Sequence, residues 1–493
     1  AALAAALIAV GGVILSWKSA DRPVPTAPAA VTHSIAVLPF LDMSEAKDQH
    51  YLADGMTEEI LNHLAKAENL RVIARTSTFA LRDTKLDVKE IGDRLGVDYV
   101  LEGSVRRSGD RVRITAQLID AATNLHAWSQ TYDRTLDDLF AVQDDIAASV
   151  ASALQVELAD GAARDARQPS FQAYEQYLLG QTHYYRRGPG DVEESIDYYR
   201  RSVEIDPRFA RAWAALAGAY ALLDDANPGN EMHREQQGDA ARRAVALDPK
   251  LAVAQARLAQ YFHAIGQHEL GNEHFENAVT LDPNDPLVLG FTSSKAVARG
   301  DLPAAIDIWR RLVQQDPLSQ LNHHNLGTFL LATGRQEEAI AEFRRALELS
   351  PTGEGNQIDL ARALILTGET TEAASLVLQR PPGLQRDLIF ALLVRDPQHG
   401  PAARALLSQL KVPPVDVSAS VYLAEALTHS GEHEAAFRVL EATRAETERR
   451  KAESATLQLY LRDELLVAPF LAPLHDDPRW AKLTASPPAA TWQ

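Results

Sequence analysis

Histidines are the side chains of this 493-residue sequence that most readily suggest chemistry, because several of them fall close together in its second half. They could hold a metal ion, and they are His263, His268, His274, His323 and His324. A two-histidine site on one helix face needs the four-residue spacing of H-E-x-x-H. His268-Glu269 is followed by Asn272 at that place, and His274 lies six residues on. We therefore predict no metal site.

Catalytic motifs are also missing from the sequence. It has no G-x-S-x-G elbow, no G-x-x-x-x-G-K-[ST] loop and no G-x-G-x-x-G after a strand, so acyl transfer and nucleotide chemistry lack a site. It has no cysteine, which excludes a catalytic thiol, thiolate zinc sites and disulfides. Adjacent acids on a helix point about 100° apart, so we interpret four such pairs as solvating charge: Glu58-Glu59, Asp137-Asp138, Asp144-Asp145 and Glu193-Glu194. We predict no catalytic residue, no cofactor and no enzyme activity.

Charge argues against nucleic acid as a partner. Lys and Arg total 49 against 67 Asp and Glu, a net charge of -18, so a nucleic-acid surface would be a local exception. The local candidate is a basic cluster on the solvent face or turn of a predicted hairpin, where arginines commonly protect a strand edge: Arg106, Arg107, Arg111 and Arg113. The Asp54-Gly55 pair ahead of Thr57 could form an anion-binding loop at a helix N-terminus, but we favour simple capping.

The elements that would position these residues begin with a mixed α/β unit at residues 34–158. Short β-branched runs predict buried strands, and apolar residues at helical spacing predict amphipathic helices. A period-two pattern on both sides of a Ser-Gly-Asp turn predicts a hairpin. The predicted elements are a strand at 34–40, a helix at 51–67, a strand at 70–74, a helix at 88–95 ended by Gly96, strands at 99–107, 111–119 and 125–133, and a helix at 136–158.

The second half of the sequence repeats itself. Four prolines lie 34 residues apart, which is the tetratricopeptide period: Pro249, Pro283, Pro317 and Pro351. Pro207 precedes them by 42 residues, the same period with an insertion near 224–230. We predict an all-α superhelical solenoid with repeats at 170–380. Degenerate repeat-like helices and a C-terminal cap follow at 381–485, and a polar stretch near 160–170 joins two separately stable units.

The first residues are apolar. Residues 1–17, AALAAALIAVGGVILSW, carry no charge and reach the lower limit of about 17–25 residues for a bilayer crossing, so we predict a transmembrane helix. The alternative is the core of a secretory signal, with Ala27-Pro28-Ala29 as a small-residue cleavage site. The Pro/Ala-rich residues 18–33 should form an extended linker, because proline disfavours a helix.

The first folded unit resembles a known family through several sequence blocks in one order: SIAVLPFLDMS, YLADGMTEEILNHL, LRVIARTSTF, IGDRLGVDYVLEGSVRRSGDRVRITAQLID and YDRTLDDLFAVQDDIA. They resemble the TolB-like N-terminal domain that precedes tetratricopeptide arrays in bacterial proteins. The resemblance implies a non-catalytic module in membrane-anchored chains that also carry a winged-helix DNA-binding domain (CadC/ToxR-like) or an adenylate cyclase domain.

The resemblance therefore implies the periplasmic part of a single-pass transcriptional regulator of the bacterial inner membrane. The alternatives are the C-terminal regulatory part of a class III adenylate cyclase and a stand-alone periplasmic scaffold. Either way the expected partner is a protein or peptide in the groove of the solenoid, with the membrane bound through residues 1–17 and no nucleic acid bound by this segment. The sequence does not decide whether the chain forms a homo-oligomer.

The repeat register also predicts which residues face the partner. Four residues at intervals of 34 point about 200° from the core of their own repeat, so they should form one row: Gln260, Ser294, Thr328 and Arg362. The resemblance puts this row on the concave wall, beside Ala256, Gly290, His324 and Ile358. Of these residues His324 and Arg362 are the best candidates for contact with the partner, because they offer directional or charged hydrogen bonds in an otherwise small and apolar groove. The alternative, which we favour, is that both are solvated side chains. A clamp for a C-terminal carboxylate lacks support, because no lysine joins Asn325.

Overall fold

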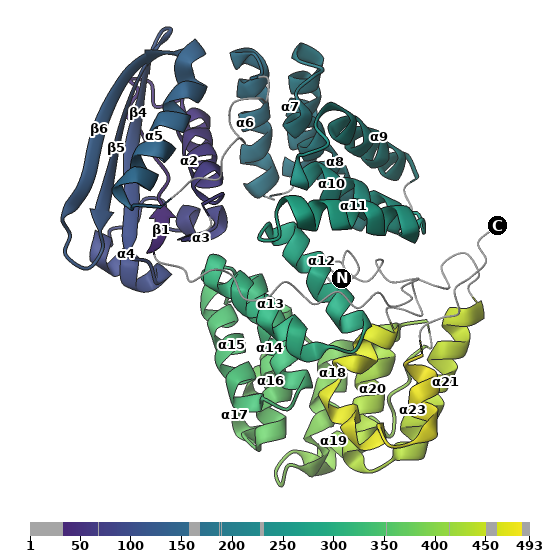
Figure 1. Cartoon of the computed structure of the whole chain (residues 1–493). Coiled ribbons are helices and arrows are strands. Elements are labelled where there is room, and N and C mark those ends of the chain that lie inside the picture. The colour runs from purple at the N-terminus through teal and green to yellow at the C-terminus, as the bar shows by residue number, and fades with distance from the viewer. Residues whose placement is uncertain are drawn as a thin grey trace.

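The computed structural model describes residues 33–67, 69–156, 168–186, 188, 190–226, 231–351, 353–413, 415–449 and 461–485. The predicted transmembrane helix at 1–17 and all but the last residue of the linker lie outside these ranges. Within them, no helix has the length and apolar character that a bilayer crossing requires. The structure consists of a mixed sheet with helices, followed by a curved array of helix pairs (Figure 1).

The sheet is built in the order β3-β1-β4-β5-β6, with β2 paired to β4. β1 runs parallel to β3 and β4, while β4, β5 and β6 form an antiparallel meander. The turn between β4 and β5 contains the predicted glycine, and β6 is an edge strand. The strands are β1 (His33–Val37), β2 (Leu41–Asp42), β3 (Leu70–Val72), β4 (Tyr99–Ser108), β5 (Arg111–Asp120) and β6 (His126–Thr135).

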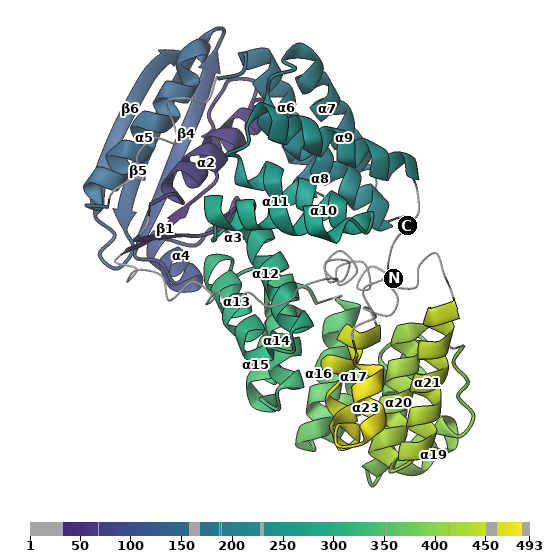
Figure 2. The same cartoon turned by 45° about the vertical axis from the view of Figure 1, so that its right-hand side comes forward.

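Helices pack on both faces of this sheet at β1 and β4, because Ile35 and Leu101 face one core cluster, whereas Ala36 and Val100 face Ile91 and Leu95 on the other side. The second face of β5 and β6 is left largely to solvent (Figures 1 and 2).

The helices of the sheet unit are α2 (His50–Leu64), α3 (Arg75–Phe79), α4 (Val88–Leu95), the short η1 (Leu136–Asp138) and α5 (Leu139–Ala153). A capping box fixes the start of α4: Glu90 N donates to Asp87 Oδ1 at 2.8 Å, and Asp87 N donates to Glu90 Oε2 at 2.8 Å. The helix ends before Gly96, as predicted.

The structure corrects the interpretation of Asp54-Gly55. These residues lie in the interior of α2, not in a loop at its N-terminus. Asp54 pairs with Arg82 at 2.5 Å. A Cβ added at Gly55 would lie 2.4 Å from the Leu178 side chain, so glycine lets the first repeat helix approach α2 closely. The pair therefore serves packing between the two halves of the chain.

The repeats begin with α6 (Phe171–Arg186) and follow the predicted period. The first helices of four successive pairs start at residues 252, 286, 320 and 354. The helices after α6 are α7 (Asp191–Ile205), α8 (Ala210–Ala226), α9 (Glu231–Leu247), α10 (Ala252–Ala264), α11 (His268–Leu281), α12 (Pro286–Ala298), α13 (Leu302–Gln315), α14 (Gln320–Ala332), α15 (Gln336–Leu349), α16 (Glu354–Thr367) and α17 (Thr370–Leu378).

The C-terminal part is irregular, as the loss of the small-residue pattern indicated. It consists of α18 (Leu384–Ala391), η2 (Leu392–Arg395), α19 (Gly400–Leu407), α20 (Val417–Ser430), α21 (His433–Arg449), η3 (Pro469–Leu474) and α23 (Pro478–Leu483). Residues 461–466 are also helical. The helix at 478–483 has no counterpart among the predicted elements.

Glycine at the turns between paired helices has a measurable role. Gly334 joins α14 to α15 with φ of +78°, a left-handed conformation that a Cβ disfavours. We expect Gly334→Ala to lower the free energy of unfolding by about 1 kcal/mol in chemical denaturation. Gly290, inside α12, is the matched control. An added Cβ there meets no atom within 4 Å, so Gly290→Ala should stabilise by about 0.4–1 kcal/mol. A loss at both positions would contradict this argument.

The two halves of the chain share one buried apolar cluster, which differs from the prediction of units joined only by a polar stretch. The cluster joins Ile60 of α2 and Ile146 of α5 to Tyr174 of α6 and Tyr199 of α7. All four side chains are at most 1% exposed. The sheet unit therefore uses the first repeats as part of its own core, so the two halves should not be stable when separated.

The junction also buries charge, and this corrects the interpretation of Glu58 and Glu59 as solvating. Glu58 is 9% and Glu59 4% exposed, because α2 lies between the sheet and α6 (Figure 1). Arg75 Nε lies 3.2 Å from Glu58 Oε2, and Gln181 Nε2 donates to Glu58 Oε1 at 2.7 Å. Arg211 donates from NH1 to both oxygens of Glu59 at 2.6 Å.

A second contact joins the sheet unit to the middle of the array. Ser77 of α3 donates to the Asp316 carboxylate and accepts from Leu318 N at 2.8 Å. Arg71 NH1 donates to Gln314 O at 2.9 Å. The sheet unit thus contacts the solenoid at two places: at its first helices, and again at the turn between α13 and α14. The residues of that turn are about 240 positions away from Ser77 in the sequence.

Candidate functional site

The predicted row of groove residues lies on the first helices of successive repeats. Gln260 is on α10, Ser294 on α12, Thr328 on α14 and Arg362 on α16. Ser294 is 3% exposed, and its hydroxyl donates to Gly290 O at 3.0 Å. Thr328 donates to His324 O at 3.0 Å. Both hydroxyls therefore bond within their own helices, which leaves Gln260 and Arg362 as the longer polar side chains of the row.

His324 and Arg362 are brought together through one carboxylate. His324 Nε2 lies 3.6 Å from Asp359 Oδ2, and Arg362 NH1 donates to Asp359 Oδ1 at 2.8 Å. Arg362 NH2 also donates to both oxygens of Glu425, at 2.7 and 2.8 Å. The guanidinium lies 5.1 Å from the centre of the Tyr422 ring. The structure thus places two carboxylates beside the arginine.

This network is buried, which sets its electrostatics. Arg362 is 7% exposed and Glu425 0%. Burial raises the pKa of Glu425 above its ordinary value, against the opposing charge of Arg362. Burial alone would lower the pKa of Arg362, but the charges of Glu425 and Asp359 raise it. The arginine is thus a buried cation that is already paired within the chain.

The C-terminal residues cover the network. Phe470 N donates to Glu425 Oε1 at 3.4 Å, and the Phe470 ring packs edge-on against His429 with centroids 5.0 Å apart. Arg462 donates to Ala298 O at the end of α12, so the segment before η3 spans from α12 to α20. In Figure 1 this segment lies over α18 and α20. The second half of the solenoid is therefore lined by the chain's own residues.

The surface around Gln260 has a different character. Arg257 NH1 donates to Gln260 Oε1 at 3.0 Å, and its NH2 donates to the Tyr184 hydroxyl at 3.3 Å. No carboxylate of the described residues lies within 4.0 Å of this half-buried guanidinium, and its buried Nε has no acceptor among them. One repeat further on, Gly290 leaves open space where a Cβ would be. We call Tyr184, Arg257, Gln260 and Gly290 the Arg257 surface.

Sequence reasoning missed Arg257 and Tyr184. They are 73 residues apart, and only the fold of α6 against α10 brings them together. A signal for Arg257 was available in the register, since it lies three residues before Gln260 on the same helix. The observed position of the Arg257 side chain also requires glycine at position 218, because a Cβ there would lie 2.9 Å from the guanidinium.

The histidines examined for metal binding form hydrogen-bonded pairs. His263 Nδ1 lies 3.3 Å from His268 Nδ1, and His274 Nδ1 lies 2.7 Å from Gln255 Oε1. His323 lies between Glu342 and Pro317 O, at 2.6 and 2.9 Å. None of these pairs recruits a third histidine or carboxylate ligand within the described residues.

A different group has metal-like spacing. His183 Nδ1 lies 2.9 Å from both Asp191 Oδ1 and Glu194 Oε2. From the sequence, Glu194 is interpreted only as solvating charge, and nothing singles out His183 or Asp191. Arg186 lies 3.3 Å from the same Asp191 oxygen, and Gly188 N donates to Oδ2 at 2.8 Å. The aspartate is therefore satisfied by donors that join α6 to α7, and a cation there would meet the charge of Arg186.

Three of the four arginines in the predicted basic cluster on the hairpin make polar contacts within the chain. Arg106 Nε donates to Met43 O at 3.0 Å, and Arg113 pairs with Asp133 at 2.9 Å. Arg107 reaches Gln49 at 3.0 Å and lies 3.6 Å from Glu175 of α6. These arginines support the hairpin and the junction.

Comparison with known proteins finds matches for both halves of the chain. Residues 31–149 match the second domain of HilA/YgeH-like transcriptional regulators, and residues 294–354 and 330–395 match tetratricopeptide repeats. The chain is 40% identical over 230 residues to a protein of Rhizobium meliloti named putative adenylate cyclase 3. That alignment covers 44% of this chain and 39% of the relative, so the chain spans less than half of the relative's length.

Solved structures with some likeness include a human IFIT1 dimer with m7Gppp-AAAA, at 18% identity and a TM-score of 0.37 over 62% of this chain and 77% of that one. Pseudomonas aeruginosa PilF is 20% identical with a TM-score of 0.34, over 41% of this chain and 90% of that one. These likenesses are too low to carry an argument. The family matches establish that the chain contains tetratricopeptide repeats.

Proposed function

We propose that the chain is a non-catalytic scaffold whose solenoid binds an acidic segment of a protein partner at the Arg257 surface. The observation that carries the proposal is a half-buried guanidinium with no carboxylate of the described residues within 4.0 Å, and open space one repeat further on at Gly290. Tetratricopeptide arrays bind extended peptides or helices along their concave faces, and arginine binds carboxylates with two parallel hydrogen bonds.

The neighbours of Arg257 favour this role. Tyr184 and Gln260 hold its NH2 and NH1 groups, which reduces the conformational freedom that binding would otherwise cost. Gly218 lets the side chain lie flat against α8. By contrast, the buried guanidinium of Arg362 already has two carboxylates, so a partner would have to displace Asp359 or Glu425 to reach it.

The binding proposal is tested with a fluorescein-labelled peptide of four glutamates flanked by glycines, titrated with the full chain and followed by fluorescence anisotropy. We expect Arg257→Gln to weaken binding by about tenfold or more, because a charge-assisted hydrogen bond contributes about 1.5–3 kcal/mol. Arg299→Gln removes the same charge from an exposed position at the end of α12 and should have little effect.

Gly290→Leu should also block the peptide, because it fills the open space without changing charge. Equal affinities of the Arg257→Gln and Arg299→Gln variants would contradict the proposal, since long-range attraction alone would then account for binding.

For the cellular context, we propose the periplasmic part of a membrane-anchored transcriptional regulator of the bacterial inner membrane, held by residues 1–17. The match of residues 31–149 to a domain of HilA/YgeH-like transcriptional regulators supports it. The second candidate is the C-terminal regulatory part of a class III adenylate cyclase, which the 40% identity to a putative adenylate cyclase favours. A stand-alone periplasmic scaffold is the third. The TolB-like resemblance remains part of this proposal.

The sequence encoded upstream of Ala1 distinguishes these contexts. A basic winged helix would support the regulator, and a cyclase domain would support the second candidate. A start codon followed only by basic residues would favour the stand-alone scaffold, because basic residues mark the cytoplasmic side of a membrane segment.

A further inference from the structure

Tyr185 of α6 is the only exposed residue among the phenylalanines, tyrosines and tryptophans that the structure describes. It is 43% exposed, whereas the others are buried or half-buried. Tyrosine and arginine are enriched among the residues that contribute most of the binding energy at protein interfaces. A lone exposed aromatic residue close to an arginine is therefore a candidate contact site for a partner.

Tyr184 connects Tyr185 to the Arg257 surface. The centroids of the two tyrosine rings are 5.3 Å apart with an interplanar angle of 84°, and the Tyr184 hydroxyl accepts from Arg257 NH2 at 3.3 Å. The charge of Glu58 and the desolvation of the hydroxyl raise the pKa of Tyr185 above its ordinary value. The charges of Arg75 and Arg257 oppose this shift, so Tyr185 is neutral at physiological pH and lies within reach of the charge of Arg257.

The sheet unit holds the Tyr185 ring from α3. The Arg75 guanidinium lies 3.8 Å from the centroid of the Phe79 ring and 4.1 Å from that of Tyr185. Arg75 also lies 3.2 Å from Glu58, so its charge is already paired, unlike that of Arg257. These contacts restrain the Tyr185 ring, which reduces the conformational freedom that a partner's binding would cost. Both halves of the chain thus contribute to this surface.

We infer that the acidic segment bound at the Arg257 surface also carries an aromatic side chain, which packs on Tyr185. The inference rests on the proposed function and names a second kind of residue that the partner supplies. In an extended segment, alternate residues share a face and lie about 6.5–7 Å apart, so an acid on Arg257 and a ring on Tyr185 can come from residues two positions apart. A ring is favoured over an aliphatic chain, because aromatic pairs gain from offset-stacked or edge-to-face contact in addition to the burial of apolar area.

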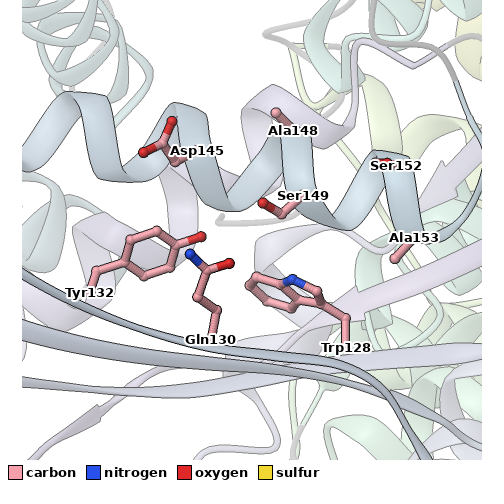
Figure 3. Close-up of a pocket in the computed structure, with 8 residues that line it drawn as sticks. All are labelled: Trp128, Gln130, Tyr132, Asp145, Ala148, Ser149, Ser152 and Ala153. Atoms are coloured by element: carbon pink, nitrogen blue, oxygen red, sulfur yellow. The ribbon is translucent and has the colours of Figure 1, made fainter.

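A groove between β6 and α5 does not suit the same segment (Figure 3). Its volume is about 480 Å³, and Trp128 and Tyr132 of β6 point toward α5. Tyr132 is 2% exposed, so its ring already belongs to the core of the sheet unit. Asp145 is the only charged residue among those that line the groove, and it would repel an acidic segment. The acidic partner is therefore assigned to the Arg257 surface.

Two fluorescein-labelled peptides of equal charge test the inference: GGEEFEEGG, and GGEEAEEGG with alanine in place of phenylalanine. Acids on both sides of the central residue make the test independent of the direction in which the peptide binds. In fluorescence anisotropy with the full chain, the phenylalanine peptide should bind about tenfold more tightly, which corresponds to about 1.4 kcal/mol. Tyr185→Ala should reduce this preference to about threefold or less. It should leave the affinity for the alanine peptide within about twofold, which also shows that the variant is folded.

Two control variants should keep the preference for phenylalanine. Tyr185→Phe retains the ring, and Leu247→Ala removes a side chain of similar exposure at the end of α9. An undiminished preference in the Tyr185→Ala chain would overturn the inference, as would equal binding of the two peptides by the wild-type chain. In that second case, weaker binding of the alanine peptide by Arg257→Gln would leave the proposed function standing, whereas no effect of Arg257→Gln would overturn both.

Discussion

Replacing Arg362 by methionine should lower the free energy of unfolding by about 3–5 kcal/mol, because it leaves buried carboxylates without their counter-charge. Glu425 is fully buried, and both its oxygens accept from Arg362. Methionine keeps much of the apolar volume, so the loss comes mainly from the uncompensated charge. Urea denaturation at neutral pH measures it, with an m-value that should stay unchanged.

Two further variants isolate the cause. Arg344→Met removes an exposed arginine that pairs with Glu372 at 3.0 Å on the outside of the array, and it should cost at most about 1 kcal/mol. Replacing both Arg362→Met and Glu425→Leu should recover part of the lost stability, because the fully buried carboxylate is removed with its counter-charge, while Asp359 still lacks Arg362. If the double variant is no more stable than Arg362→Met, the loss reflects packing and the electrostatic argument fails.

The second large effect concerns Glu58 at the junction of the two halves. Burial, with the neighbouring charges of Glu59 and Asp54, raises the pKa of Glu58 to about 7 against the opposing effects of Arg75 and of the Gln181 hydrogen bond. A folded-state pKa above the unfolded value means that the native protein binds the proton more tightly. Its contribution to stability is therefore complete below about pH 4.5 and is lost as pH rises through 7, by about 3 kcal/mol in all.

Glu58→Gln should remove this dependence, since glutamine cannot titrate and keeps the shape of the side chain. Between pH 5 and 8 the wild-type chain should lose stability relative to the variant, and at pH 8 the variant should be the more stable of the two. Glu193→Gln, at an exposed acid on α7, is the matched control and should leave the profile unchanged. Parallel profiles for the wild-type and Glu58→Gln chains would show that Glu58 stays charged throughout.

The repeat period predicted the solenoid because the signal is local. Proline and small residues recur every 34 positions, and the helices of the central pairs start at that interval. The meander was predictable for the same reason, since period two and a Ser-Gly-Asp turn specify a hairpin within about twenty residues. Such features depend on residues that lie close together in the sequence.

What the sequence could not predict depends on distant contacts. Glu58 and Glu59 look like any exposed acidic pair until α6 packs on α2. Arg362 reads as a groove residue until Glu425, 63 residues away, is seen to hold it. Arg257 gains its character from Tyr184 and from the absence of a described carboxylate within 4.0 Å, and neither follows from periodicity.

The two contacts of the sheet unit with the solenoid have a mechanical consequence. An array of stacked repeats normally bends along its whole length, because each repeat touches only its neighbours. Here the four helix pairs from α6 to α13 are fastened at both ends, through the α2–α6 packing and the contacts of Ser77 with Asp316 and Leu318. That stretch behaves as a closed frame of fixed curvature. Beyond α13 a separate tie, the segment that links α12 through Arg462 to α20 through Phe470, limits the bending of the later repeats.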